Sequence, residues 1–102
     1  MKYHLVLQLP ATSESDIDRL YEIEEQLERI VRSPAYVDGH DCGSGEMNFF
    51  IYTNNPKNTF AAVKKYFDKS EYAESFKAAY REATGETYTI LWPSSLESFS
   101  II

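Results

Sequence analysis

The chain has 102 residues, 43% of them hydrophobic and 15% aromatic, and a formal net charge of −6 at pH 7. This length fits one domain, and the apolar content is sufficient for a packed core, so the composition excludes a disordered chain. The acidity argues against binding to a nucleic-acid backbone, which requires clustered lysine and arginine. The single cysteine, Cys42, forms no internal disulfide, and no apolar run approaches the roughly 18 residues of a membrane span. We therefore expect a cytoplasmic protein that binds neither nucleic acid nor membrane.

The N-terminal part predicts a strand followed by a helix. Lys2 to Leu9 alternate apolar and mixed side chains, and Pro10 ends this strand. Ser13 is placed to cap a helix, and Pro34 ends it. The apolar side chains of this helix recur every three or four residues, which predicts one buried stripe. The stripe consists of Ile17, Leu20, Ile23, Leu27, Ile30 and Val31.

The middle of the chain predicts two more strands and the start of a second helix. Ala35 to Asp38 reads as a short strand, and Met47 to Thr53 as a strand with large apolar side chains on both faces. Asn55 and Pro56 mark a helix start, as N-cap and first helical residue. The buried face of this helix is predicted to hold Phe60, Val63, Tyr66 and Phe67.

The C-terminal part predicts a third helix and a last strand. Apolar side chains from Tyr72 to Ala83 follow helical spacing, and Gly85 is placed to end that helix. Glu86 to Trp92 has the threonine and aromatic content of a strand, which Pro93 terminates.

The predicted order β-α-β-β-α-α-β indicates an α+β domain over residues 1–93. Its economical packing is a ferredoxin-like split β-α-β arrangement, with one four-stranded antiparallel sheet and the helices on one face. The first and third strands are then central. Residues 94–102 form an apolar tail that docks on the domain or forms an interface.

The stretch from Val37 to Glu46 concentrates unusual residues, among them three of the four glycines. One interpretation is a metal or acid–base site that includes His40, Asp41 and Glu46. The others are a wide hairpin connection shaped by its glycines, and a binding loop. The spacing matches neither a zinc signature nor a calcium loop. A catalytic pair of His40 and Cys42 is disfavoured, since a lone cysteine mostly behaves as a small hydrophobe.

This stretch also carries a resemblance. Asp38-Gly39-His40-Asp41, followed by Gly43-Ser44-Gly45-Glu46 and a hydrophobic strand, resembles a stretch of small bacterial ferredoxin-like proteins of unassigned function. The resemblance implies a stand-alone bacterial domain whose hairpin is shaped by this motif. It implies no catalytic role for these residues.

The sheet face away from the helices is a second candidate region, because it is expected to expose Val6, Phe50 and Tyr52. Such an aromatic patch is more typical of a protein interface than of free surface. RNA-recognition domains stack bases on this face, but they place basic and glycine residues beside the aromatic ones, which this strand lacks. His4 is predicted to be a surface or interface histidine on the same face.

The first helix is predicted to have an acidic outer face, suited to a cationic partner. Our hypothesis is therefore a protein that acts by protein–protein contact, as an immunity-type inhibitor or a self-associating homodimer. The alternative is a small enzyme or a ligand- or metal-binding domain that uses the Asp38–Glu46 loop. The candidate binding residues are His40, Asp41, Glu46, Phe50 and Tyr52. We assign no catalytic residue, metal or cofactor.

Overall fold

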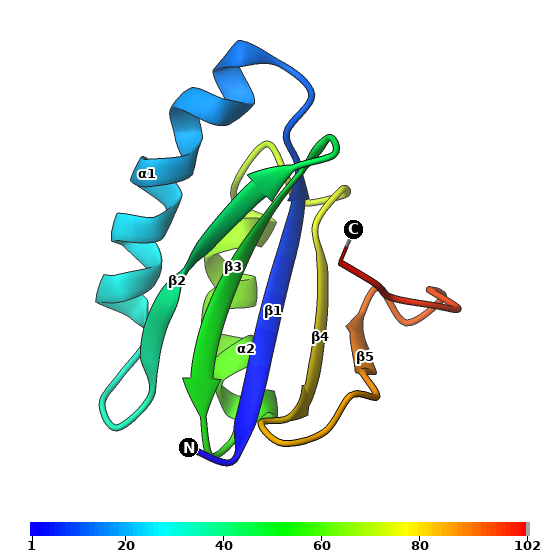
Figure 1. The fold of residues 1–102 in the computed structure, drawn as a ribbon. Helices are drawn as coiled ribbons and strands as arrows, with labels where there is room; N and C mark the ends of the chain where they lie inside the picture. Colours follow the sequence, from blue (N-terminus) through cyan, green and yellow to red (C-terminus); the bar gives the residue numbers. More distant parts are fainter. Residues whose placement is uncertain (102) are drawn as a thin grey trace.

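The computed structural model describes residues 1–101, which form an α+β domain with two helices and five strands (Figure 1). In chain order these are β1 (Tyr3–Pro10), α1 (Glu14–Ile30), β2 (Tyr36–Gly43), β3 (Glu46–Thr53), α2 (Pro56–Asp68), β4 (Lys77–Glu82) and β5 (Thr89–Trp92).

The five strands form one open sheet with the order β2-β3-β1-β4-β5, in which every neighbouring pair is antiparallel. The predicted antiparallel sheet is therefore confirmed, although it has five strands and not four. β1 lies at the centre, and its residues His4 to Leu9 are all buried. β1 and β2 run in the same direction with β3 between them, so α1 connects two parallel strands across an intervening one.

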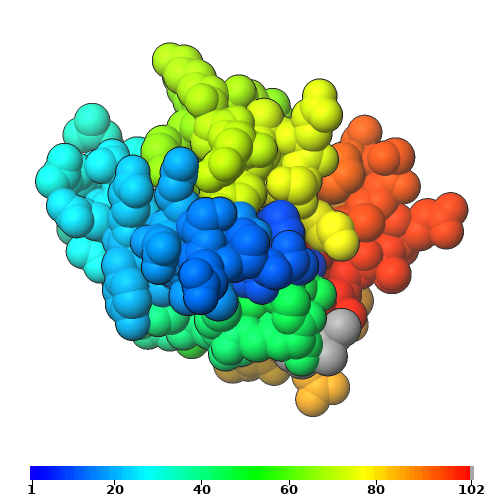
Figure 2. All heavy atoms as spheres, turned by 90° about the horizontal axis from the view of Figure 1, so that it is seen from above, coloured from blue at the N-terminus to red at the C-terminus, as the bar shows by residue number. Residues whose placement is uncertain are grey.

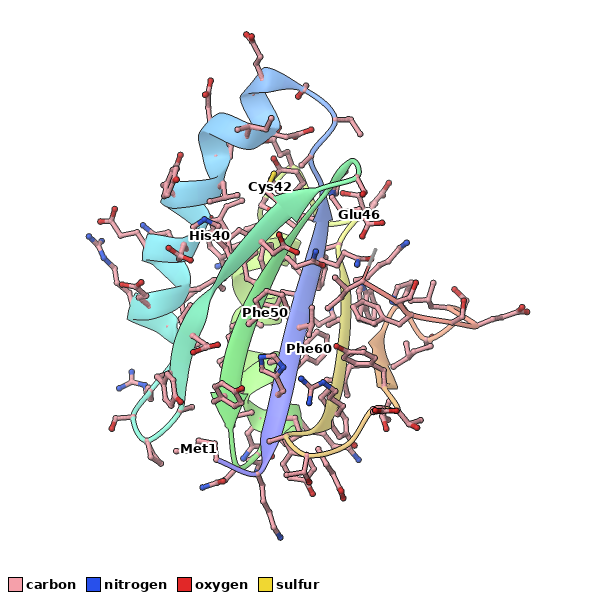
Figure 3. All side chains as sticks on the ribbon, in the orientation of Figure 1. Met1, His40, Cys42, Glu46, Phe50 and Phe60 are labelled. Carbon is pink, nitrogen blue, oxygen red and sulfur yellow. The ribbon has the colours of Figure 1, made fainter. Side chains whose placement is uncertain are left out.

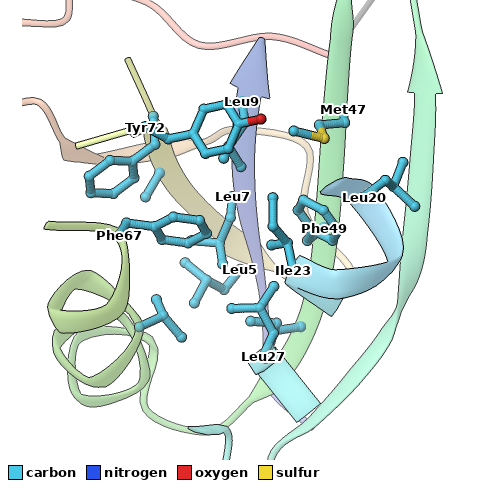
Figure 4. Packing of buried hydrophobic residues seen from close by; sticks show 14 residues of the cluster. Leu5, Leu7, Leu9, Leu20, Ile23, Leu27, Met47, Phe49, Phe67 and Tyr72 are labelled. Carbon is cyan, nitrogen blue, oxygen red and sulfur yellow. The ribbon is translucent and has the colours of Figure 1, made fainter. Parts of the chain in front are cut away.

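Both helices pack on the same face of the sheet and cover the leucines of β1 (Figures 1 and 4). α1 begins at the Ser13 N-cap, whose hydroxyl accepts a hydrogen bond from the Asp16 N–H, and α2 begins at the Asn55 N-cap, as predicted. The core cluster on this face comprises Leu5, Leu7, Leu9, Leu20, Ile23, Leu27, Met47, Phe49, Ile51, Val63, Phe67, Tyr72, Phe76 and Ala78.

Ile17 departs from the stripe predicted for α1. It is 50% exposed, whereas Leu20, Ile23 and Leu27 are buried. At 3.6 residues per turn, Ile17 stands about 90° around the helix from the centre of the buried face. Its side chain therefore lies on the flank of α1, not in the core.

The predicted third helix, from Tyr72 to Ala83, is wrong. Residues 71–75 form turns, and β4 follows as a strand that pairs with the edge of β1 that β3 does not occupy. Phe76 and Ala78 face the core, so the segment also has the period-2 pattern of a strand. Pairing with β1 satisfies the backbone of both strands, and this tertiary gain overrides a local helical spacing.

The glycine-rich stretch is mostly strand. β2 does not stop at Asp38 as predicted; it continues to Gly43, and a β-bulge between Val37 and Gly39 accommodates Asp38. The predicted wide connection is a two-residue turn, Ser44-Gly45, with φ of 54° and 80°. Positive φ at both positions is the geometry of a type I′ turn, which matches the right-handed twist of the flanking strands.

The end of the described chain, at Ser100, lies on the sheet face away from the helices. Figure 2, seen from above, shows α2 and the last described residues on opposite sides of β1. The backbone oxygen of Ser100 accepts a hydrogen bond from Gln8 Nε2 at 3.0 Å, and the Phe99 ring lies 5.1 Å from that of Tyr88. The predicted tail ends at residue 102, which lies outside the described residues.

The turn geometry gives a first prediction. Gly45→Ala should lower the free energy of unfolding by about 1 kcal/mol, because an L-residue with a side chain is strained at a φ of +80°. Gly43→Ala is the matched control, since a Cβ there meets nothing within 4 Å and φ is not positive. Urea unfolding measures both variants, and equal stabilities would contradict the type I′ turn.

Candidate functional site

The structure divides the candidate residues of the glycine-rich stretch between two faces of the sheet. His40 is opposite Phe49, which faces the helices, whereas Asp41 is opposite Asn48 on the other face. Glu46 shares the face of Asp41, because side chains alternate along a strand. The structure therefore does not bring His40 together with Asp41 and Glu46.

On the helix side, His40 contacts α1 (Figure 3). Its Nδ1 lies 2.7 Å from Glu24 Oε2, and its ring meets the Tyr21 ring edge-on at 5.4 Å. A carboxylate accepts only, so the ring nitrogen donates in this bond. The contact connects the flank of α1 to β2 and holds the Tyr21 ring against the strand.

The flank of α1 beside β2 carries a stripe, hereafter the Ile17–Glu28 flank, whose members are exposed except for Glu24, which His40 covers in part. Ile17, Tyr21, Glu24 and Glu28 follow the i, i+4, i+7, i+11 spacing of one helix face. Ile17 is 50% exposed and Tyr21 is 70% exposed. The residues predicted from the sequence did not include Tyr21, although it follows Ile17 by four residues and so lies on the same face of the helix.

The whole of α1 is acidic. It carries seven carboxylates and two arginines between Glu14 and Ile30, hence a net charge of −5 in a chain of −6. One of the carboxylates, Asp16, accepts a hydrogen bond from the buried Tyr72 hydroxyl, which lowers the pKa of Asp16. Because α1 carries a net charge of −5 in a chain of −6, the negative potential of the protein is concentrated on this helix.

β2 is an edge strand, and among the described residues it pairs only with β3. An edge strand leaves about half of its backbone N–H and C=O groups unpaired. Within residues 1–101, no turn or loop backbone bonds to those of β2. The exposed carboxylates of Asp38 and Asp41 lie along this strand.

On the face away from the helices, Phe50 and Tyr52 lie together, as predicted for one strand face. They flank the imidazole of His4, with ring centroids at 5.3 Å and 4.5 Å, and Tyr36 continues the row 5.6 Å from Tyr52. Val6, which was expected to be exposed there, is fully buried. This face is therefore much less open than the sequence suggested.

His4 is a buried residue of this face, not a surface histidine; it is 8% exposed. Its Nδ1 accepts a hydrogen bond from Arg81 Nη2 at 3.1 Å, so the proton of the neutral ring is on Nε2. Nε2 is buried and has no partner within the described residues. Burial lowers the pKa of His4, and Arg81 lowers it further, whereas Asp38 acts in the opposite direction.

Polar side chains also line the upper end of this face. Gln8 Nε2 donates to Asn48 Oδ1 at 3.0 Å as well as to Ser100. Beside them is a hollow of about 170 Å³ lined in part by Gln8, Glu46 and Lys77. Glu46 Oε2 is buried and unpartnered within residues 1–101. This volume suits a few waters or a very small ligand, and is below that of ordinary ligand pockets.

A wider hollow of about 430 Å³ lies at the other end of β4, where Arg81 is part of the lining. Arg81 Nη1 donates to the backbone oxygens of Glu82, Ala83 and Gly85, so its guanidinium orders the chain after β4. Its donors are thus committed to the fold rather than offered to a ligand.

In the described part of the chain, no group of three or more histidine, cysteine or acidic side chains could hold a metal ion. Cys42 is a free, exposed thiol. No helix of residues 1–101 has the length and apolarity needed to cross a bilayer.

Comparison with protein-family models, with curated proteins and with solved structures found no match to this chain. The resemblance to small bacterial ferredoxin-like proteins therefore stays a prediction.

The environment of His4 predicts a pH dependence. Its folded-state pKa lies below the 6.5 of an unfolded histidine, so the unfolded chain binds the proton first as pH falls. His4 should therefore reduce stability below pH 6.5, with a slope of at most about 1.4 kcal/mol per pH unit. His4→Gln should flatten that part of the stability curve. An NMR titration midpoint of His4 at or above 6.5 would contradict the assignment.

Proposed function

We propose that this protein acts by protein–protein contact and presents the Ile17–Glu28 flank and the neighbouring β2 edge to a cationic partner. The observation that carries the proposal is Tyr21, a large aromatic side chain that is 70% exposed among carboxylates and braced by His40. Tyrosine is enriched at the energetic centres of protein interfaces, where it supplies contact area at low entropic cost.

The charge of α1 supports a basic partner. A net charge of −5 on one exposed helix attracts a cationic surface and speeds the encounter. Glu28 is exposed on the same flank as Tyr21, so a carboxylate and an aromatic anchor would meet the partner together, whereas Glu24 is held by His40. An immunity-type inhibitor of a basic toxin or enzyme has this character, by analogy.

The opposite sheet face is a poorer contact surface. We assign the segment of residues 94–101 as an intramolecular cover for part of it; the bond from Gln8 to Ser100 and the Tyr88–Phe99 ring pair support this. Val6 and Ala79 are fully buried on that face. A partner binding there would have to displace this segment first.

We also infer that β1-α1-β2-β3-α2-β4 is a ferredoxin-like split β-α-β unit with β5 added at one edge. The strand order supports this, since each helix connects two parallel strands with a third strand between them. A bacterial, cytoplasmic origin is part of the same proposal. It is supported by the sequence resemblance and by a free, exposed Cys42, which needs no oxidising compartment.

Tyr21→Ala tests the proposal. With the protein as bait in cells that produce it, the captured partner should be basic, and Tyr21→Ala should weaken its affinity by about tenfold or more. Raising the salt concentration should also weaken binding. Tyr36→Ala is the matched control, because Tyr36 is 50% exposed but lies on the other face of β2. If only Tyr36→Ala reduced binding, the contact surface would be the opposite face.

A second candidate function is binding of a small hydrogen-bond donor in the hollow beside Glu46, favoured by the buried, unpartnered Oε2. Small alkylammonium ions should then raise the melting temperature of the wild-type protein and not that of Glu46→Gln. Equal shifts for both proteins, or none, would remove this candidate.

A further inference from the structure

We propose that the outer edge of β2 is a pairing site for an extended, basic segment of the partner, which joins the sheet as an additional strand. This inference rests on the proposed function and specifies how the partner binds. In strand addition, backbone hydrogen bonds give affinity and side-chain contacts on the two faces give specificity.

The backbone of β2 is suited to pairing. After the bulge at Asp38, residues Gly39 to Gly43 pair with β3 in unbroken register, so their outward N–H and C=O groups are regularly spaced. A Cβ built on Gly39 or on Gly43 meets nothing within 4 Å. Because a Cβ points away from the plane of the sheet, both ends of this segment are uncovered on the face to which that Cβ points.

The charges on the two sides of β2 define the partner. Side chains of an added strand alternate between the faces of the sheet. On one face they would meet Asp41, which is opposite Asn48, and Asp38, whose charge acts on His4 of that face. On the other face they would meet Glu28 of the Ile17–Glu28 flank, since α1 runs beside β2 (Figure 1). Lysine or arginine on both faces of the segment would complement this edge, with an apolar residue to contact Tyr21.

A second copy of the chain fits this edge poorly. Pairing of β2 with β2 about a two-fold axis would place both α1 helices on the same sheet face, next to each other across the junction. Each α1 carries a net charge of −5, so the helices would repel one another. The charge distribution therefore favours a basic partner over a homodimer.

The test uses the full chain and a short synthetic peptide of lysine, arginine, valine and threonine, basic on both faces when extended. The peptide should protect alternate amides between Gly39 and Gly43 from hydrogen exchange, as measured by NMR. The same peptide with alternate backbone amides methylated keeps its charge but cannot pair along one edge. It should bind about tenfold or more weakly, because several backbone hydrogen bonds are lost.

Charge variants locate the contact. The double variant Asp38→Asn, Asp41→Asn should weaken peptide binding several-fold, whereas Glu86→Gln, Glu97→Gln changes the net charge equally at exposed positions elsewhere. The inference would be overturned if the two double variants weakened peptide binding equally, or if the peptide did not bind at all. It would also be overturned if the methylated and unmethylated peptides bound with equal affinity. Concentration-dependent protection of the β2 amides without peptide would overturn it as well, because it would indicate self-association. The proposed function would survive each of these results if partner capture still depended on Tyr21, and would fail separately if it did not.

Discussion

The structure depends on the burial of β1 at the centre of the sheet. This strand is paired on both edges, with β3 and β4, and covered on both faces, so His4 to Leu9 are all removed from water. Its leucines require the two helices, while His4, Val6 and Gln8 require cover on the other face. The need to cover both faces of β1 accounts for the positions of α1, α2 and the C-terminal segment, because buried apolar area is the main source of stability.

Burial of polar side chains on the second face has its own consequence. Gln8 and His4 can be buried there because Asn48, Ser100 and Arg81 supply hydrogen bonds to them. That face is therefore occupied largely by contacts within the chain. At the α1–β2 edge, by contrast, Tyr21 is 70% exposed although its ring meets that of His40, and the outer edge of β2 has no backbone partner among the described residues. This contrast is the physical basis for placing protein recognition at the edge.

The candidate site was only partly predictable from sequence. His40, Asp41 and Glu46 are close in the chain, but the alternation of a strand separates His40 from the other two once β2 extends to Gly43. Phe50 and Tyr52 could be placed on one face, because the alternation of β3 was already evident. Tyr21 was missed because helical spacing assigned Ile17 to the core, and only the position of α1 on the sheet shows which flank is left uncovered.

Local signals in the sequence determined β1, β3 and the starts of both helices, since alternation, the Ser13 and Asn55 caps and Pro56 act over a few residues. Tertiary structure decided the rest. The segment around Phe76 satisfies both a helical and a strand pattern, and the open edge of β1 selects the strand. Gly39 to Gly43 could form a loop or a strand, and pairing with β3 selects the strand. In both segments the local preferences are nearly balanced, so long-range pairing determines the conformation.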